Sequence, residues 1–178
     1  MTTAYDARAK FLHWLVAPLL LLQFVVSYLM PHIGRNTVAG TLINLHFSCG
    51  VLIFVLMLVR FVARLRNPVP LAPAALAWEN FVALTTHRAI YFILLLSPFL
   101  GWASASSHNL KVNVFGIFTL PDLVEPRTEW ANTAGDVHGY LMWTLLGLVG
   151  LHIAAALFHQ FIQKDGVLLR MLPARVDR

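Results

Sequence analysis

Histidine is the residue type in this sequence best suited to chemistry, because several histidines lie inside or beside strongly apolar segments. The sequence contains eight histidines, and five of them occupy such positions: His13, His46, His138, His152 and His159. A polar side chain within a membrane is costly and is usually functional. Imidazole nitrogens are common ligands of haem iron. The pattern therefore favours a membrane protein that binds haem.

The spacing of two histidines predicts two haems stacked across the membrane. His138 and His152 are 14 residues apart, so on one helix they share a face and are separated by about 21 Å along the axis. That separation suits electron transfer between two macrocycles. His159 lies seven residues further on and continues the same stripe.

Four apolar segments must position these histidines. The length of each segment is close to the roughly 20 residues that a helix needs to cross a bilayer. They span residues 11–30, 42–63, 89–107 and 138–162. The sequence therefore predicts an all-α membrane protein, a bundle of four transmembrane helices forming one domain over residues 1–178. We expect residues 64–86 to form a loop lying partly along the membrane interface, and residues 108–137 to form a longer loop at the other end.

The composition agrees with a membrane protein: 58% of the residues are hydrophobic and 12% are charged, against about a quarter charged in soluble domains. The only cysteine, Cys49, cannot form an internal disulfide, hold an iron–sulfur cluster or attach a haem covalently through two thioethers. Any haem must therefore be bound non-covalently.

The distribution of basic residues predicts the orientation. Of thirteen Lys and Arg, three fall on one side of the predicted bundle, Arg35, Lys111 and Arg127, and ten on the side of the two termini. Basic residues are enriched on the cytoplasmic side of membrane proteins. We therefore expect both termini in the cytoplasm. The excess of cations is then explained by contact with lipid headgroups, not with nucleic acid.

Depth in the membrane indicates which histidines face each other. His46 follows the outer start of the second segment and lies level with His138, so these two can bind an outer haem. His13 lies near the cytoplasmic side and can pair with His152 or with His159. Depth alone slightly favours His159 over His152 as the partner of His13. Gly50, Gly135 and Gly139 near these histidines let a flat macrocycle approach the backbone, although small residues also serve plain helix packing.

Two other interpretations of membrane histidines remain. A single one is often only a hydrogen-bonding group between helices, but four at matching depths on three helices make coincidence a weaker explanation. A transition-metal channel or transporter would also use histidine, yet few acidic residues within the segments accompany them. His32 and His108 lie at outer helix ends, where we expect them to be solvated.

Three stretches carry a family resemblance: His13-Trp14-Leu15, the segment from His46 to Pro70 (HFSCGVLIFVLMLVRFVARLRNPVP), and the segment from His138 to Pro173. With Phe115–Pro121, they make the chain resemble bacterial cytochrome b561 over nearly its whole length. The resemblance implies four helices and two haem b groups in a bacterial inner membrane. His46 and His138 would hold the outer haem, and His13 and His152 the inner one.

The resemblance also implies superoxide:quinone oxidoreduction. Superoxide would be oxidised to O2 outside and ubiquinone reduced in the membrane, with Arg35, Lys111 and Arg127 available to attract the superoxide anion. His159, His87 and Arg88 lie near the cytoplasmic boundary, where they could bind quinone or relay protons. Family members often carry a lysine in the proline-rich cytoplasmic loop, and residues 71–77 contain none.

Two alternatives to this function follow from the same residues. The chain could be an electron-relay anchor between a dehydrogenase, or another periplasmic redox partner, and the quinone pool. It could also be a structural or transport protein with incidental histidines. Haem absorption bands would exclude the last of these, and reduction by superoxide without a partner protein would separate the first two.

Overall fold

The computed structural model describes residues 5–34, 36–68 and 76–172, and four long helices dominate it. Their bounds are α1 Ala7–Leu29, α2 Thr41–Arg66, α3 Ala77–Ser107 and α4 Glu129–Phe158. All four are long and apolar enough to span a membrane. The predicted all-α membrane bundle is therefore confirmed. Two short strands, β1 Asn113–Val114 and β2 Phe118–Thr119, pair as an antiparallel hairpin between α3 and α4.

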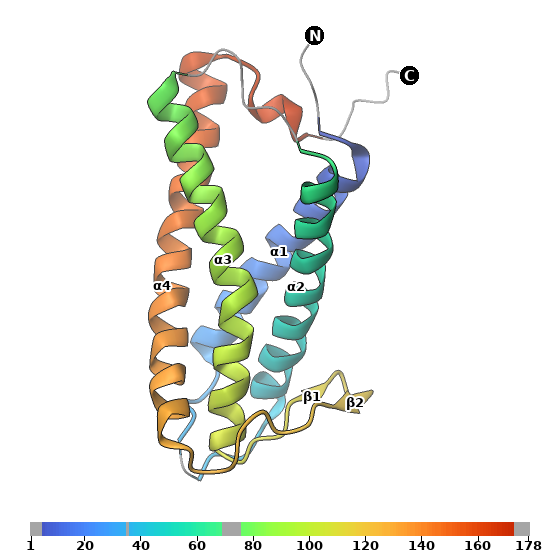
Figure 1. The fold of residues 1–178 in the computed structure, drawn as a ribbon, viewed down its shortest axis with the longest axis vertical. Helices are drawn as coiled ribbons and strands as arrows, with labels where there is room; N and C mark the ends of the chain where they lie inside the picture. Colours follow the sequence, from blue (N-terminus) through green and yellow to red (C-terminus); the bar gives the residue numbers. More distant parts are fainter. Residues whose placement is uncertain (1–4, 35, 69–75, 173–178) are drawn as a thin grey trace.

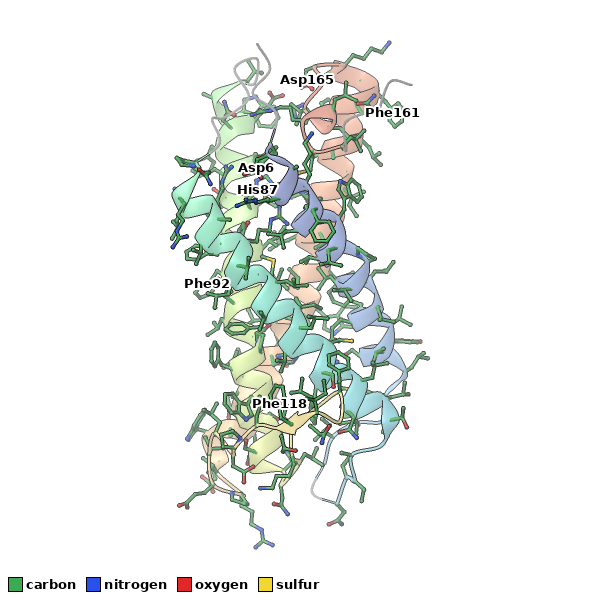
Figure 2. All side chains as sticks on the ribbon, turned by 90° about the vertical axis from the view of Figure 1, so that its right-hand side faces the viewer. Asp6, His87, Phe92, Phe118, Phe161 and Asp165 are labelled. Atoms are coloured by element: carbon green, nitrogen blue, oxygen red, sulfur yellow. The ribbon has the colours of Figure 1, made fainter. Side chains whose placement is uncertain are left out.

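The helices form an elongated bundle with both chain ends at the same end (Figure 1). α3 packs along α4, α1 packs along α2, and α2 also contacts α3. The hairpin lies at the opposite end and projects sideways. We call these the termini end and the hairpin end. Figure 2 places His87 and Asp165 towards the termini end and Phe118 towards the hairpin end.

The buried core consists of two clusters, one in the middle of the bundle and one at the hairpin end. The middle cluster joins all four helices through Val16, Ile53, Met57, Ile93, Leu94 and Leu145. The second cluster packs the start of α2 against the end of α3 and the hairpin through Ile43, Phe47, Ala105, Leu110, Val112 and Val114. Apolar side chains elsewhere on the helices are exposed, as expected where lipid surrounds them.

Two predicted loops are shorter than expected. α3 begins at Ala77 and α4 at Glu129, whereas the sequence suggested loops up to residues 86 and 137. Glu79 caps the start of α3, since its Oε2 accepts a hydrogen bond from the Leu76 N–H at 2.9 Å. The expectation of loop structure is therefore wrong for residues 64–66, 77–86 and 129–137, where the helices continue past the most apolar stretch.

The segment after α4 folds back over the start of α1 and closes the termini end. A five-residue π-helix, His159–Gln163, follows α4, and a short 3-10 turn, Leu168–Arg170, comes next. The Lys10 Nζ donates to the Leu172 carbonyl at 2.8 Å, and the Trp14 indole N–H donates to the Met171 carbonyl at 3.0 Å. These contacts tie the two ends of the chain together.

Candidate haem-binding sites

Two pairs of histidines face each other across the bundle, one pair towards each end. His46 of α2 faces His138 of α4 at the hairpin end, with 6.2 Å between the ring centres. His13 of α1 faces His152 of α4 at the termini end, and the distance is again 6.2 Å. We call these the hairpin-end pair and the termini-end pair. Each joins helices far apart in the sequence.

The separation of both pairs fits two imidazoles on one iron. An imidazole nitrogen binds a metal ion at about 2 Å and lies about 1 Å from the ring centre, so two rings on opposite sides of one ion have centres about 6 Å apart. The ring planes are inclined by 83° in one pair and 69° in the other. Rotation about the bond between metal and nitrogen permits such angles. The donor sets therefore fit haem iron, which takes histidine axial ligands.

The hairpin-end pair is oriented by neutral groups from two further helices. The Nδ1 of His138 lies 2.8 Å from the Ser97 carbonyl oxygen of α3. A proton on this Nδ1 would donate to the carbonyl and leave Nε2 free for a metal. The Nδ1 of His46 lies 3.0 Å from the side-chain amide of Gln23 in α1. A Cβ added at Gly101 would lie 3.3 Å from the His138 ring, so this glycine admits the imidazole against α3.

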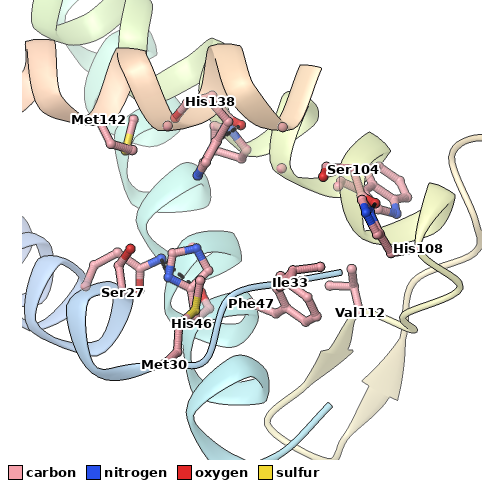
Figure 3. Close-up of a pocket in the computed structure, with 18 of the residues that line it drawn as sticks. Ser27, Met30, Ile33, His46, Phe47, Ser104, His108, Val112, His138 and Met142 are labelled. Carbon is pink, nitrogen blue, oxygen red and sulfur yellow. Dashed lines mark hydrogen bonds between the residues drawn. The ribbon is translucent and has the colours of Figure 1, made fainter. Parts of the chain in front are cut away.

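A wide pocket of about 2450 Å³ opens around the hairpin-end pair. Figure 3 shows His46 and His138 pointing towards each other across this space, with Met30, Phe47 and Met142 among the apolar walls. His108 and Arg127 line it as well. Mostly apolar walls with a few polar groups are typical of a cofactor site.

The termini-end pair differs because a cation and a third histidine lie beside it. The Arg60 guanidinium of α2 lies 3.0 Å from the His13 Nδ1, and the same guanidinium stacks over the Tyr91 ring at 5.8 Å. The His87 ring of α3 lies 5.1 Å from the His152 ring. All four helices thus contribute a polar side chain to this site.

His159 lies outside the termini-end pair. Its Nδ1 is 2.6 Å from the Asp165 Oδ2, and the ring packs against Phe158. Partial burial opposes ionisation of Asp165, but hydrogen bonds from the Val167 N–H and from His159 hold the pKa of this carboxyl below its usual range. His13 therefore meets His152, the partner that the family resemblance favoured over His159.

The remaining predicted residues do not contact the two histidine pairs, or lie outside the described residues. Arg88 is exposed on α3, next to His87 in the sequence. Lys111 forms an ion pair with Asp122, which offsets its charge, whereas Arg127 lines the hairpin-end pocket. Arg35 lies outside the described residues, as do residues 69–75. His32 and His108, expected only in solvent, also line the pocket.

Sequence reasoning missed three residues that contact the histidine pairs: Gln23, Arg60 and Gly101. Gln23 and Arg60 are polar residues within apolar helices, and that property was the signal available for both. Of the glycines singled out in the sequence, Gly135 packs against Ser104, since an added Cβ would lie 2.5 Å from the Ser104 Oγ. Gly135 therefore serves the packing of α3 on α4.

A membrane bundle with facing imidazole pairs is typical of membrane cytochromes, which hold haem through histidine ligands without a covalent bond to the macrocycle. The family model described as prokaryotic cytochrome b561 matches residues 4–174, and the chain belongs to this family. Membership implies haem b as the cofactor and electron transfer as the activity.

Curated relatives support the same family. The chain is 30% identical to a probable superoxide oxidase CybB of Yersinia pestis over 98% of this chain and 99% of the relative. It is 29% identical to cytochrome b561 homolog 1 of Escherichia coli, with 93% and 94% covered. It is also 30% identical to a cytochrome b562 of Cereibacter sphaeroides, with 92% of each chain covered.

Proposed function

We propose that the chain binds two haem b groups in the bacterial inner membrane, oxidises superoxide at the hairpin end and reduces ubiquinone. The observation that carries the proposal is the matched separation of 6.2 Å in the two histidine pairs. His46 and His138 would hold one haem, and His13 and His152 the other. Bound haem supplies one-electron transfer between its ferric and ferrous states.

The hairpin end is the proposed extracytoplasmic side, and both termini are proposed to lie in the cytoplasm. Two superoxide anions would each lose one electron and leave as O2, and the two electrons with two protons would convert one ubiquinone to its quinol. The pocket around the hairpin-end pair gives a small anion access from that side. Arg127 lines this pocket and supplies positive charge.

His159, held in place by the Asp165 carboxylate, is the proposed proton donor to ubiquinone at the termini end. The separation of 2.6 Å between the His159 Nδ1 and the Asp165 Oδ2 joins imidazole and carboxylate as one hydrogen-bonded unit, and such a unit keeps the imidazole oriented for proton transfer to a bound quinone. His87, close to His152, is the proposed second polar contact for quinone. Arg88, exposed beside it, would attract anionic groups at the membrane surface.

The relative named a probable superoxide oxidase supports superoxide as the electron donor. The test is stopped-flow mixing of the purified haem-loaded protein with superoxide, with and without ubiquinone. We expect reduction of both haems by superoxide alone, followed by quinol formation when ubiquinone is present. Haems that stay oxidised under superoxide but are reduced by a redox protein would overturn superoxide oxidation and leave the relay function.

A further inference from the structure

The hairpin between α3 and α4 exposes an apolar tip. The side chains of Phe115, Ile117 and Phe118 are 51%, 79% and 50% exposed. Its other side is buried, because Val112 and Val114 pack in the cluster at the start of α2. The hairpin is therefore two-sided: one side belongs to the core of the protein, and the other presents large apolar groups outwards.

The tip lies beside α2, not beyond its end. The Phe115 N–H donates to the Ser48 Oγ at 2.9 Å, and Ser48 is seven residues past the start of α2, about 10 Å along the helix. Ser48 is also sixteen residues before Arg64, about 24 Å, which is less than the roughly 30 Å thickness of the hydrocarbon layer. With Arg64 at the opposite headgroups, a tip at the level of Ser48 would lie at the edge of the hydrocarbon layer. Figure 1 shows the hairpin projecting sideways from the bundle at this end.

The backbone N–H groups of the tip have hydrogen-bond partners inside the protein. The Phe115 N–H donates to Ser48, the Gly116 N–H to the Asn113 side chain at 2.7 Å, and the Ile117 N–H to the Val114 carbonyl at 2.9 Å. Unpaired backbone groups are strongly unfavourable in lipid. Three consecutive N–H groups have partners inside the protein, beneath exposed apolar side chains, and this lowers the cost of placing the tip against lipid.

The conformation of Phe115 adds an independent observation. Phe115 and Gly116 have φ values of 51° and 74°, a left-handed pair for which Asn-Gly or Gly-Gly is the usual choice. A bulky residue there costs about 1–3 kcal/mol, and such strain is concentrated at functional positions. A phenyl ring that is exposed despite this backbone strain is explained if the ring has a favourable apolar environment outside the protein.

We propose that the tip formed by Phe115, Ile117 and Phe118 inserts into the membrane interface at the hairpin end and anchors there among lipid chains. Aromatic and aliphatic side chains partition to this boundary. Val112, at the base of the same hairpin, lines the pocket around His46 and His138. The anchor would therefore fix one wall of that pocket relative to the membrane surface.

The test is the depth of a spin label at the tip in vesicles of phosphatidylethanolamine and phosphatidylglycerol. Cys49 is the only native cysteine, so the background is Cys49→Ala with Ile117→Cys. Collision with oxygen reports lipid, and collision with a water-soluble nickel chelate reports solvent. We expect the ratio of oxygen to nickel accessibility at residue 117 to be at least threefold higher than at an aqueous site. Phe118→Cys is the second variant if Ile117→Cys does not express.

Two labelled controls define the scale. Val55→Cys lies on α2 and is 48% exposed, so it reports a lipid-facing site. Glu125→Cys lies exposed in the connection between the hairpin and α4, so it reports water. A ratio at residue 117 equal to that at residue 125 would overturn the proposal. So would low collision with both reagents, which would indicate contact with another protein.

Discussion

The groups that contact the two histidine pairs differ in charge. At the hairpin end, His46 and His138 meet an amide and a carbonyl. At the termini end, His13 meets the guanidinium of Arg60. A nearby cation favours the reduced form of an iron centre, because the reduced form carries one positive charge fewer. If haem is bound at both pairs as proposed, we expect the termini-end haem to have the higher potential, so that electrons would run from the hairpin end towards the termini end.

Arg60→Gln should therefore lower the midpoint potential of the termini-end haem. With partial screening by solvent, loss of one cation a few ångströms from a ligand is worth about 1–2 kcal/mol, or roughly 40–90 mV for one electron. Potentiometric titration of the haem absorption bands measures the shift. Arg60→Lys keeps the charge and should restore most of the potential. An unchanged potential in Arg60→Gln would show that this arginine does not set the direction of transfer.

The assignment of ligands can be tested within one pocket. His46→Ala should reduce the content from two haems per chain to one, because a single imidazole remains at that pair. His108 lines the same pocket, but its Nδ1 lies 2.8 Å from the Ser104 carbonyl. His108→Ala should therefore retain two haems. Pyridine haemochrome analysis of both variants gives the count, and two haems in His46→Ala would refute the assignment.

His159 should affect quinone reduction without affecting haem binding, because it pairs with Asp165 and not with His13. His159→Ala should keep a six-coordinate haem spectrum and reduction by superoxide, while reoxidation by ubiquinone slows by about tenfold or more. Asp165→Asn should slow the same step less. In His152→Ala, by contrast, the haem spectrum itself should change. Stopped-flow absorbance separates these cases. Loss of a haem in His159→Ala would show that His159, and not His152, pairs with His13.

At the scale of the elements, the close approach of α3 and α4 depends on Gly135. A Cβ at this position would lie 2.5 Å from the Ser104 Oγ and 3.2 Å from its Cβ. Gly135→Ala should therefore destabilise the bundle by about 1–3 kcal/mol. Gly147 is on the same helix with no atom within 4 Å of an added Cβ, so Gly147→Ala should be neutral or slightly stabilising. Thermal loss of the haem spectrum in detergent compares the two variants.

The sequence predicted the helices and the histidine stripe because both follow from local periodicity and apolar length. His138 and His152 share a helix, so a spacing of 14 residues was enough to place them on one face. The partners of these histidines depend on how other helices rotate and tilt. Arg60 beside His13 and His87 beside His152 therefore required the packed structure.

The hairpin and the early start of α3 escaped prediction for related reasons. Strands of two residues carry no periodic signal, and Phe115 is an unusual residue for a left-handed turn position. The start of α3 is supported by a contact from the other end of the chain, since the Gln163 amide donates to Glu79 at 2.6 Å. The contact from Gln163 lies far from α3 in the sequence, so it could not be read from the local pattern.

At the scale of the whole molecule, the orientation of the bundle would decide which histidine pair faces the proposed superoxide substrate. Basic residues gather at the termini end, where Arg60, Arg64 and Arg170 are also held by cation–π contacts with Tyr91 and Tyr5. The hairpin end carries Arg127 together with Lys111, whose charge is offset by Asp122. From the positive-inside rule we expect the termini end to face the cytoplasm.

A reporter fused to the C-terminus should therefore behave as cytoplasmic: green fluorescent protein should fluoresce, and alkaline phosphatase should be inactive. Phosphatase inserted after Glu125, in the connection that precedes α4, should be active. The reverse result at both positions would show the opposite orientation of the bundle in the membrane. Superoxide outside the cell would then meet His13 and His152. Equal reporter activity at both positions would instead show a mixed orientation, with ten basic residues at the termini side insufficient to fix the topology.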